Sequence, residues 1–164
     1  ASSQARAWRR KDMRKLILLL LLFTVAIAGT LLAADRGTPE QAKAMLQKAV
    51  AHYKDVGRKQ ALADFNAKKA PFGDRDLYVV CLGPDRTIIA NGGFPQYVGY
   101  PSGMLKDAEG KSVGEQGWAV ASKKGEGAVH YHWINPVTHK MEPKVTFFAK
   151  AGNDVCGVGA YNPE

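Results

Sequence analysis

The sequence predicts an α+β fold, in which helices gather at one end of the chain and an antiparallel sheet follows. Apolar residues recur with helical spacing between residues 42 and 65, and after residue 76 the pattern changes to short β-rich runs separated by turn residues. The 164 residues are 46% hydrophobic, which excludes a disordered chain. This length suits one domain plus an appendage.

Residues 1–34 form the predicted appendage. Basic residues at its start precede nineteen uncharged residues, 16–34, which end in small side chains. This layout is typical of a secretory signal peptide that starts at Met13 and is cleaved after Ala33 or Ala34. Nineteen apolar residues also span a bilayer, so an uncleaved N-terminal membrane anchor is the alternative, and a buried core helix is a third interpretation.

The charge pattern also supports a targeting signal or membrane anchor at the N-terminus. The formal net charge is +8, of which residues 1–34 contribute +5 and residues 35–164 only +3. A nucleic-acid-binding protein needs a basic face on its folded part, so this class is excluded. Because positive residues stay in the cytoplasm, we expect a periplasmic or secreted domain, or a domain held outside the inner membrane by its anchor. ATP and NAD(P) are not normally supplied there, which disfavours a nucleotide-dependent function.

A strong helix start lies at Thr38. Thr38 is expected to cap the helix, Pro39 suits the first turn and Gln41 completes a capping box. Gly57 ends or kinks this helix, and residues 58–66 are expected to form a second, shorter helix. The apolar stripe of the first helix consists of Ala42, Met45, Leu46, Ala49, Val50, Tyr53 and Val56.

Five β-rich segments follow the chain breakers Pro71 and Gly73. The predicted strands are residues 76–82, 87–90, 128–133, 144–150 and 155–161. Turn residues separate the first two strands, and the Asn-Pro sequence at 135–136 begins a long hairpin turn between the third and fourth. Residues 91–127 are rich in glycine and polar turns, with one short helix expected at 114–122.

Several segments carry a likeness to a known family, and the most specific is the Tyr-x-Trp strand with its Asn-Pro turn and the Pro-Lys strand that follows. The matching segments are residues 57–62, 76–80, 89–93, 106–111, 131–136, 142–145 and 157–161. Together they resemble the single Cache domain family of extracytoplasmic small-molecule sensors, from about Thr38 to the C-terminus. The resemblance implies a PAS-like five-stranded antiparallel sheet, a long N-terminal helix behind it, and a ligand pocket on the other face.

The resemblance also implies ligands that are often small organic anions. Most relatives sit between two membrane spans in chemoreceptors or histidine kinases, whereas this chain stops three residues after its last strand. We therefore expect residues 35–164 to form a stand-alone Cache domain that signals through a separate membrane receptor, kinase or transporter. The alternative is a membrane-anchored interaction module without a ligand, which forms a homodimer through the N-terminal helix.

Five residues are predicted to bind the ligand. Side chains alternate along a strand, so Tyr131 and Trp133 share a face, and Lys144 lies on the next strand. An organic anion needs a cation or donors in an otherwise apolar cavity, and these three offer a hydroxyl, an indole N–H and an ammonium. Tyr78 adds a hydroxyl, and Phe94 is expected to help close the cavity. The alternatives are an aromatic core and a solvated strand lysine.

Cys81 and Cys156 are the only cysteines. Each lies in a predicted strand, and the first and last strands are neighbours in a PAS-like sheet. An oxidising compartment favours a disulfide between them, and two buried free thiols are the alternative. No Cys-x-x-Cys sequence occurs, which disfavours redox exchange and c-type haem.

Metal binding and catalysis find little support in the sequence. His130 and His132 are two apart on a strand and His139 lies across the turn, but no carboxylate is close enough in sequence to complete a metal site. Residues 107–110 read as a plain turn, because the repeating acids of a calcium loop are missing. No Gly-x-Ser-x-Gly motif occurs. We therefore expect no catalytic residues, no metal and no cofactor.

Overall fold

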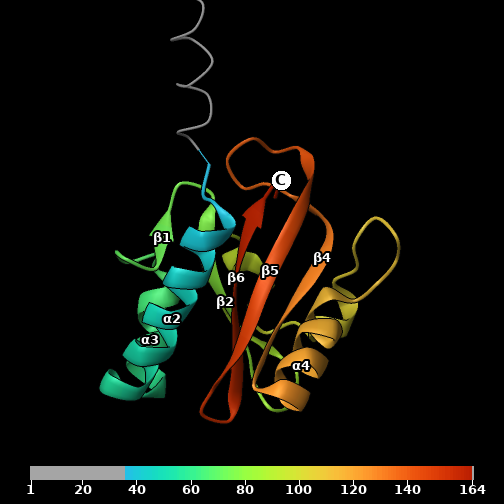
Figure 1. Cartoon of the computed structure of the whole chain (residues 1–164). Helices are drawn as coiled ribbons and strands as arrows, with labels where there is room; N and C mark the ends of the chain where they lie inside the picture. The colour runs from blue at the N-terminus through green and yellow to red at the C-terminus, as the bar shows by residue number, and fades with distance from the viewer. Residues whose placement is uncertain (1–35, 164) are drawn as a thin grey trace, which may run out of the picture. The chain divides into compact units, whose positions relative to one another are not determined.

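The computed structural model of the chain describes residues 36–163, and Figure 1 shows two layers of helices with a sheet between them. The predicted signal peptide or anchor, residues 1–34, lies outside the described residues. In the part that is described, no helix is both long and apolar enough to cross a membrane. The predicted α+β class is confirmed.

The sheet is antiparallel, with the strand order β1-β2-β6-β5-β4, and β3 also pairs with β2. It contains the predicted five strands and adds the two-residue β1, and its central pair joins the first and last predicted strands. The strands are β1 (Gly73–Asp74), β2 (Leu77–Leu82), β3 (Ile88–Asn91), β4 (Glu126–Ile134), β5 (Met141–Ala151) and β6 (Asp154–Tyr161). The β4–β5 hairpin is longer than predicted, because its ladder runs unbroken to the pair Ile134–Met141 beside the turn.

The helices begin where the sequence predicts. In α2 (Pro39–Val56), the N–H of Gln41 donates to Oγ1 of Thr38 at 3.2 Å, and the Gln41 side chain accepts from the N–H of Thr38 at 2.9 Å. This reciprocal capping box satisfies two backbone donors that the helix itself leaves unpaired. Gly57 has a φ of +80°, which a glycine adopts without strain, and separates α2 from α3 (Arg58–Asn66).

The predicted short helix is α4 (Val113–Lys124), which extends one residue earlier and two residues later than expected. Ser112 caps its start, since the Glu115 N–H donates to the serine hydroxyl. Between β3 and α4 the chain forms two 3₁₀ turns, η1 (Pro95–Tyr97) and η2 (Ser102–Met104).

Each face of the sheet is covered by different elements. Helices α2 and α3 pack on one face, and α4 packs on the other (Figure 1). The main core lies under α2 and α3 and includes the fully buried side chains of Phe65, Val79 and Val158. Alternation along β2 and β5 sends Tyr78 and Lys144 to the α4 face. The space between the sheet and helices α2 and α3 is therefore apolar, whereas the space between the sheet and α4 is partly polar.

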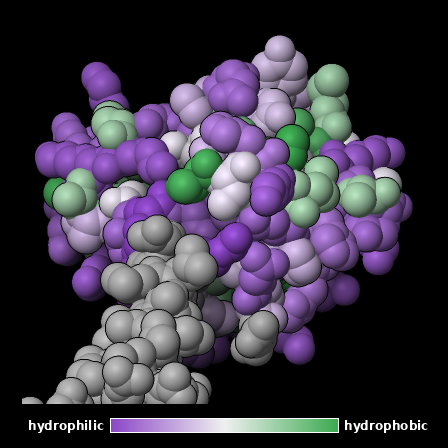
Figure 2. Space-filling model, turned by 90° about the horizontal axis from the view of Figure 1, so that it is seen from above, coloured by the Kyte–Doolittle hydropathy of each residue, from purple (hydrophilic) through white to green (hydrophobic). Residues whose placement is uncertain are grey.

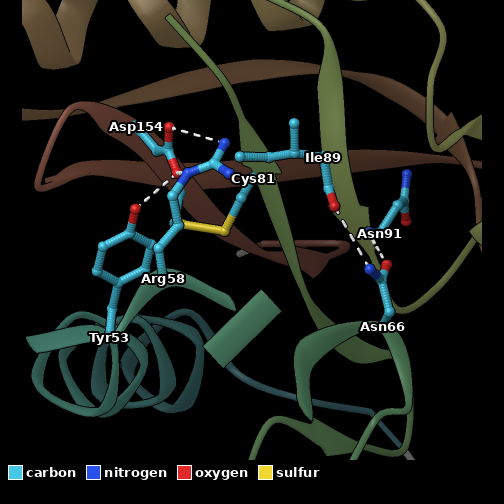
Figure 3. Close-up of a disulfide and its surroundings, with 8 residues drawn as sticks. Tyr53, Arg58, Asn66, Cys81, Ile89, Asn91 and Asp154 are labelled. Carbon is cyan, nitrogen blue, oxygen red and sulfur yellow. Dashed lines mark hydrogen bonds and ion pairs between the residues drawn. A yellow bond between two sulfur atoms is a disulfide. The ribbon is translucent and has the colours of Figure 1, made fainter. Parts of the chain in front are cut away.

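Cys81 and Cys156 are opposite one another across the central β2–β6 pair and form a disulfide (Figure 3). Beside it, Asp154 is 1% exposed and accepts hydrogen bonds from the Tyr53 hydroxyl at 2.7 Å and from Nε of Arg58 at 2.8 Å. Burial of the Tyr53 hydroxyl and its hydrogen bond to Asp154 raise the pKa of Tyr53 to about 12. The disulfide therefore joins the two central strands, and the Asp154 cluster holds the helix layer against the same end of the sheet.

Removing the disulfide is expected to destabilise the domain. In the chain-entropy model, a bridge that closes 75 residues of sequence is worth about 4 kcal/mol. We expect the Cys81→Ala, Cys156→Ala and double variants to lose this amount from the free energy of unfolding, measured by urea denaturation. The double variant should lose less than the sum of the two single losses, because all three variants break the same bond. Unfolding midpoints equal to that of the oxidised wild type would contradict a structural role for the bridge.

Candidate ligand-binding site

A cavity lies on the α4 face of the sheet, between β2, β5 and β4 on one side and the η2 turn and the start of α4 on the other. It measures about 60 Å³, counted as the space open to the centre of a water molecule. This is more space than a single water molecule needs. The lining residues are mostly apolar or aromatic: Tyr78, Val80, Leu82, Ile88, Asn91, Ser102, Leu105, Val113, Gly114, Tyr131, Trp133, Lys144, Thr146, Phe148 and Gly159.

Lys144 is the charged residue on the cavity wall. It is 3% exposed, and its Nζ donates to the hydroxyls of Tyr78 at 2.8 Å and Tyr161 at 3.1 Å. The nitrogen also lies 4.2 Å and 4.1 Å from the centroids of the same two rings, where the π electrons attract a cation. Within residues 36–163, no carboxylate forms an ion pair with it. Burial lowers the pKa of Lys144 to about 7, an effect that the charge of Asp76 partly opposes.

The tyrosines around Lys144 form a chain of neutral phenols. The Tyr161 hydroxyl donates to the backbone carbonyl of Ile134 at 2.8 Å, and its oxygen lies 3.4 Å from the Tyr78 hydroxyl. The hydroxyl of Tyr131 is 2.8 Å from Oγ1 of Thr146. Burial raises the pKa of all three phenols well above the ordinary value. They therefore stay protonated at physiological pH and offer Lys144 dipoles but no counter-charge.

Gly159 makes room for the lysine. It lies on β6 opposite Thr146 of β5, and any side chain at position 159 would collide with Cε of Lys144 and Oγ1 of Thr146. Because glycine has no Cβ, the lysine stem can lie across β6 and reach the two phenols. The site therefore depends on a residue that carries no chemistry of its own.

Two further donors line the cavity without a partner among the described residues. The side-chain oxygen of Asn91 accepts from the N–H of Phe94 at 2.9 Å, which leaves its NH₂ group unpaired. The backbone N–H of Asn91 donates to Asn66 at 2.9 Å, which fixes this strand end against α3 (Figure 3). The indole N–H of Trp133 also lacks a partner in the described part of the chain. Residues that carry an ammonium, an amide and an indole N–H therefore line a mainly apolar space, the usual composition of an anion pocket.

The family model described as single Cache domain 2 matches residues 38–161. The chain belongs to this family. The resemblance seen in the sequence is confirmed, and membership places the chain in a family of sensory, ligand-binding domains. No curated protein matches the chain at a significant level.

Three solved structures are similar to this Cache domain. A methyl-accepting chemotaxis protein from Vibrio parahaemolyticus RIMD 2210633 is 22% identical, with a TM-score of 0.62, and the match covers 84% of this chain and 95% of that one. The periplasmic sensor domain of a chemotaxis protein is 21% identical, with a TM-score of 0.58 and coverage of 75% and 89%. A Cache chemosensory domain described for carboxylic acid recognition is 18% identical, with a TM-score of 0.57 and coverage of 85% and 96%. At these identities the likeness shows a common fold.

The structure brings together four of the five predicted site residues. Tyr78, Tyr131, Trp133 and Lys144 line one cavity. Phe94 is not part of this lining. Its ring packs edge-on against Tyr78, with centroids 5.9 Å apart, so it supports the wall from behind. Lys144 is buried, so the alternative of a solvated strand lysine is wrong.

Sequence reasoning missed two residues of the site. Tyr161 accepts a hydrogen bond from Lys144, and Asn91 brings an amide to the cavity lining. Tyr161 could have been found from strand register, since it pairs directly with Lys144 across β5 and β6. Asn91 follows the last residue of a predicted strand, and no sequence signal places it beside the hairpin. The contributions of Ser102, Leu105 and Val113 come from the segment with the weakest pattern.

A buried polar cluster holds the hairpin turn above the cavity. Asn135 is fully buried, and its NH₂ group donates to Asp76 at 3.1 Å and to Glu142 at 3.0 Å. Arg36 binds both oxygens of Glu142 and thereby lowers the pKa of that carboxyl to about 2. The N–H of Gly37 donates to Asp76 at 2.8 Å. These contacts tie the first described residues to the strand that carries Lys144.

The histidines considered as metal ligands do not come together. Nδ1 of His132 lies 3.1 Å from Glu109, and between residues 36 and 163 no group of three or more His, Cys, Asp or Glu side chains is placed to hold a metal. Asp107 accepts from the backbone N–H groups of Glu109 and Lys111, as expected of a plain turn.

The burial of Lys144 predicts an unusual pH dependence of stability. The pKa of this lysine is about 7 in the folded domain and about 10.4 when unfolded, so between these values the unfolded chain binds one more proton. The free energy of unfolding should therefore rise with pH, by about 1 kcal/mol per unit between about pH 7 and pH 9. Tyr78, Tyr131 and Tyr161 remain protonated throughout this window.

Urea denaturation across this pH range measures the effect. Lys144→Met should abolish the rise, and Lys150→Met, on the exposed part of the same strand, should retain it. A slope that is unchanged in Lys144→Met would show that another group causes it.

Proposed function

We propose that this Cache domain is an extracytoplasmic sensor for a small organic acid and that the ligand carboxylate binds Lys144. One observation carries the proposal: a buried ammonium without an acidic partner lies on the wall of a cavity of about 60 Å³. A buried charge is stable only when it is paired or can lose its proton. A carboxylate that enters the cavity supplies the missing counter-charge.

The other lining groups indicate how the acid is oriented. The amide of Asn91 and the indole of Trp133 donate to the carboxylate oxygens that Lys144 leaves free. Val80 and Phe148 line the cavity beside these donors and provide an apolar surface for a short carbon chain. The solved Cache chemosensory domain described for carboxylic acid recognition supports this ligand class by analogy. No step of the proposal needs a catalytic residue or a cofactor.

The proposed setting follows from the N-terminal sequence. We place residues 35–164 in the periplasm or outside the cell, released from a signal peptide or held at the inner membrane by residues 16–34. The sensor passes its signal to a separate membrane receptor, kinase or transporter. Relatives of similar fold from chemotaxis proteins support a membrane partner.

The rival function, an interaction module that forms a homodimer through the long helix, is less well supported. The apolar face of α2 is already buried against the sheet of its own chain. Its outer face carries mainly polar and charged residues, among them Lys43, Gln47, Lys48 and Lys54. A dimer through α2 would therefore have to pair polar, charged faces. Figure 2 shows a different surface, the end of the domain seen from above, where hydrophilic residues predominate and apolar side chains are scattered among them.

Titration calorimetry with acetate, propionate and butyrate tests the sensor function. We expect at least one acid to bind the wild type, and Lys144→Met to reduce the affinity by at least about tenfold, since it removes a buried charge partner. Lys150→Met should bind like the wild type. The absence of binding by any acid in the panel, with a folded protein, would contradict the proposal.

The pH dependence of binding provides an independent test. Only the protonated lysine pairs with a carboxylate, and in the empty domain the pKa of Lys144 is about 7. The dissociation constant should therefore rise above about pH 7, by up to about tenfold per pH unit, and binding should take up a proton. Calorimetry in buffers of different ionisation enthalpy measures this uptake. An affinity that is constant from pH 6 to pH 9 would exclude Lys144 as the charge partner.

A further inference from the structure

We propose that Lys144 also forms a reversible covalent imine with small carbonyl compounds that enter the cavity. A 2-oxo carboxylate is then held by a carbon–nitrogen bond as well as by its charge. This inference rests on the proposed function for the cavity as the ligand site, and it names a narrower chemical class of ligand.

The geometry of Lys144 favours a nucleophilic amine. Its Nζ ends a four-carbon stem on the cavity wall, and none of the described carboxylates pairs with it. A desolvated lysine in an apolar pocket is the usual source of Schiff-base chemistry, because the free amine is the reactive form. At pH 7 about half of Lys144 is free amine, whereas an exposed lysine has less than about one part in a thousand.

The two phenols that contact Nζ are placed to move the protons. In the first step the amine nitrogen bonds to the carbonyl carbon, and the π electrons of the C=O bond move to oxygen, which takes up a proton while nitrogen loses one. In the second step the new hydroxyl takes up a proton from solvent, the carbon–oxygen bond breaks, water leaves, and the nitrogen lone pair forms the C=N bond of the protonated imine. Tyr78 and Tyr161 lie 2.8 and 3.1 Å from Nζ and relay these protons. No oxidant, reductant or metal is consumed.

The surroundings of Lys144 also suit the product. The smallest 2-oxo carboxylates have only five or six heavy atoms, which suits a small cavity of about 60 Å³. Its carboxylate remains next to the iminium nitrogen, so the buried positive charge acquires a partner in the same molecule. The unpaired donors of Asn91 and Trp133 are available to the carboxylate oxygens. An aldehyde or ketone without a carboxylate forms the same bond but leaves the charge uncompensated.

Reductive trapping of the folded wild-type protein tests the inference. The protein is treated at pH 7 with glyoxylate, the smallest 2-oxo carboxylate, and cyanoborohydride, and the modified lysines are mapped by peptide mass spectrometry. We expect Lys144 to be labelled at least about tenfold faster than Lys150, which is exposed on the same strand. Excess acetate should slow the labelling of Lys144 only. Equal rates at the two lysines would overturn the inference.

A denatured control separates the cavity from the local sequence. In urea the preference for Lys144 should disappear, and a preference that persists would count against the role of the cavity. Calorimetry with acetate, propionate and butyrate distinguishes this inference from the proposed function. Binding of any of these acids without selective labelling refutes the imine and leaves the acid sensor intact, whereas selective labelling without binding of any of them supports the imine and refutes the simple acid sensor. If neither occurs, both fail.

Discussion

The burial of one ammonium group, that of Lys144, is the constraint around which this domain is organised. A lysine removed from water either finds a counter-charge or gives up its proton. Here the protein supplies two neutral phenol oxygens and two ring faces, but none of its described carboxylates reaches the nitrogen. The charged state is thus incompletely compensated, and a cavity lies beside it. Both proposed reactions of Lys144, ion pairing with an acid and imine formation with a carbonyl compound, follow from this incompletely compensated charge.

The fold keeps this arrangement in place with two polar clamps. At one end of the sheet, Asp154 binds Tyr53 and Arg58 next to the central disulfide. At the other end, Asn135 and Glu142 fix the hairpin turn and the start of the domain. The lysine strand runs between these clamps and cannot shift easily to expose its ammonium to water.

The sequence predicts the frame of the molecule well, because local signals determine it. The capping box at Thr38, the apolar stripe of α2 and the five β-rich runs all correspond to observed elements. Strand alternation also places Tyr131 and Trp133 on one face, and Lys144 was expected on the strand that follows the turn. The burial of Lys144 was not predictable, since it depends on Gly159 of a distant strand and on the register that places Tyr161 beside it. The position of Phe94 behind the wall depends on the irregular turns after β3, where side-chain contacts rather than periodicity set the path.

The most direct test of this account is an NMR titration of the Lys144 side chain in the empty and the acid-bound domain. Selective labelling of lysine ε-carbons gives the pKa of each lysine separately. The account predicts a pKa near 7 for Lys144 in the empty domain, and a rise by at least about one unit when the domain is saturated with an acid that binds in calorimetry, because a ligand that prefers the charged form must raise the pKa of Lys144. A pKa near the ordinary lysine value, unchanged by the acid, would contradict the account.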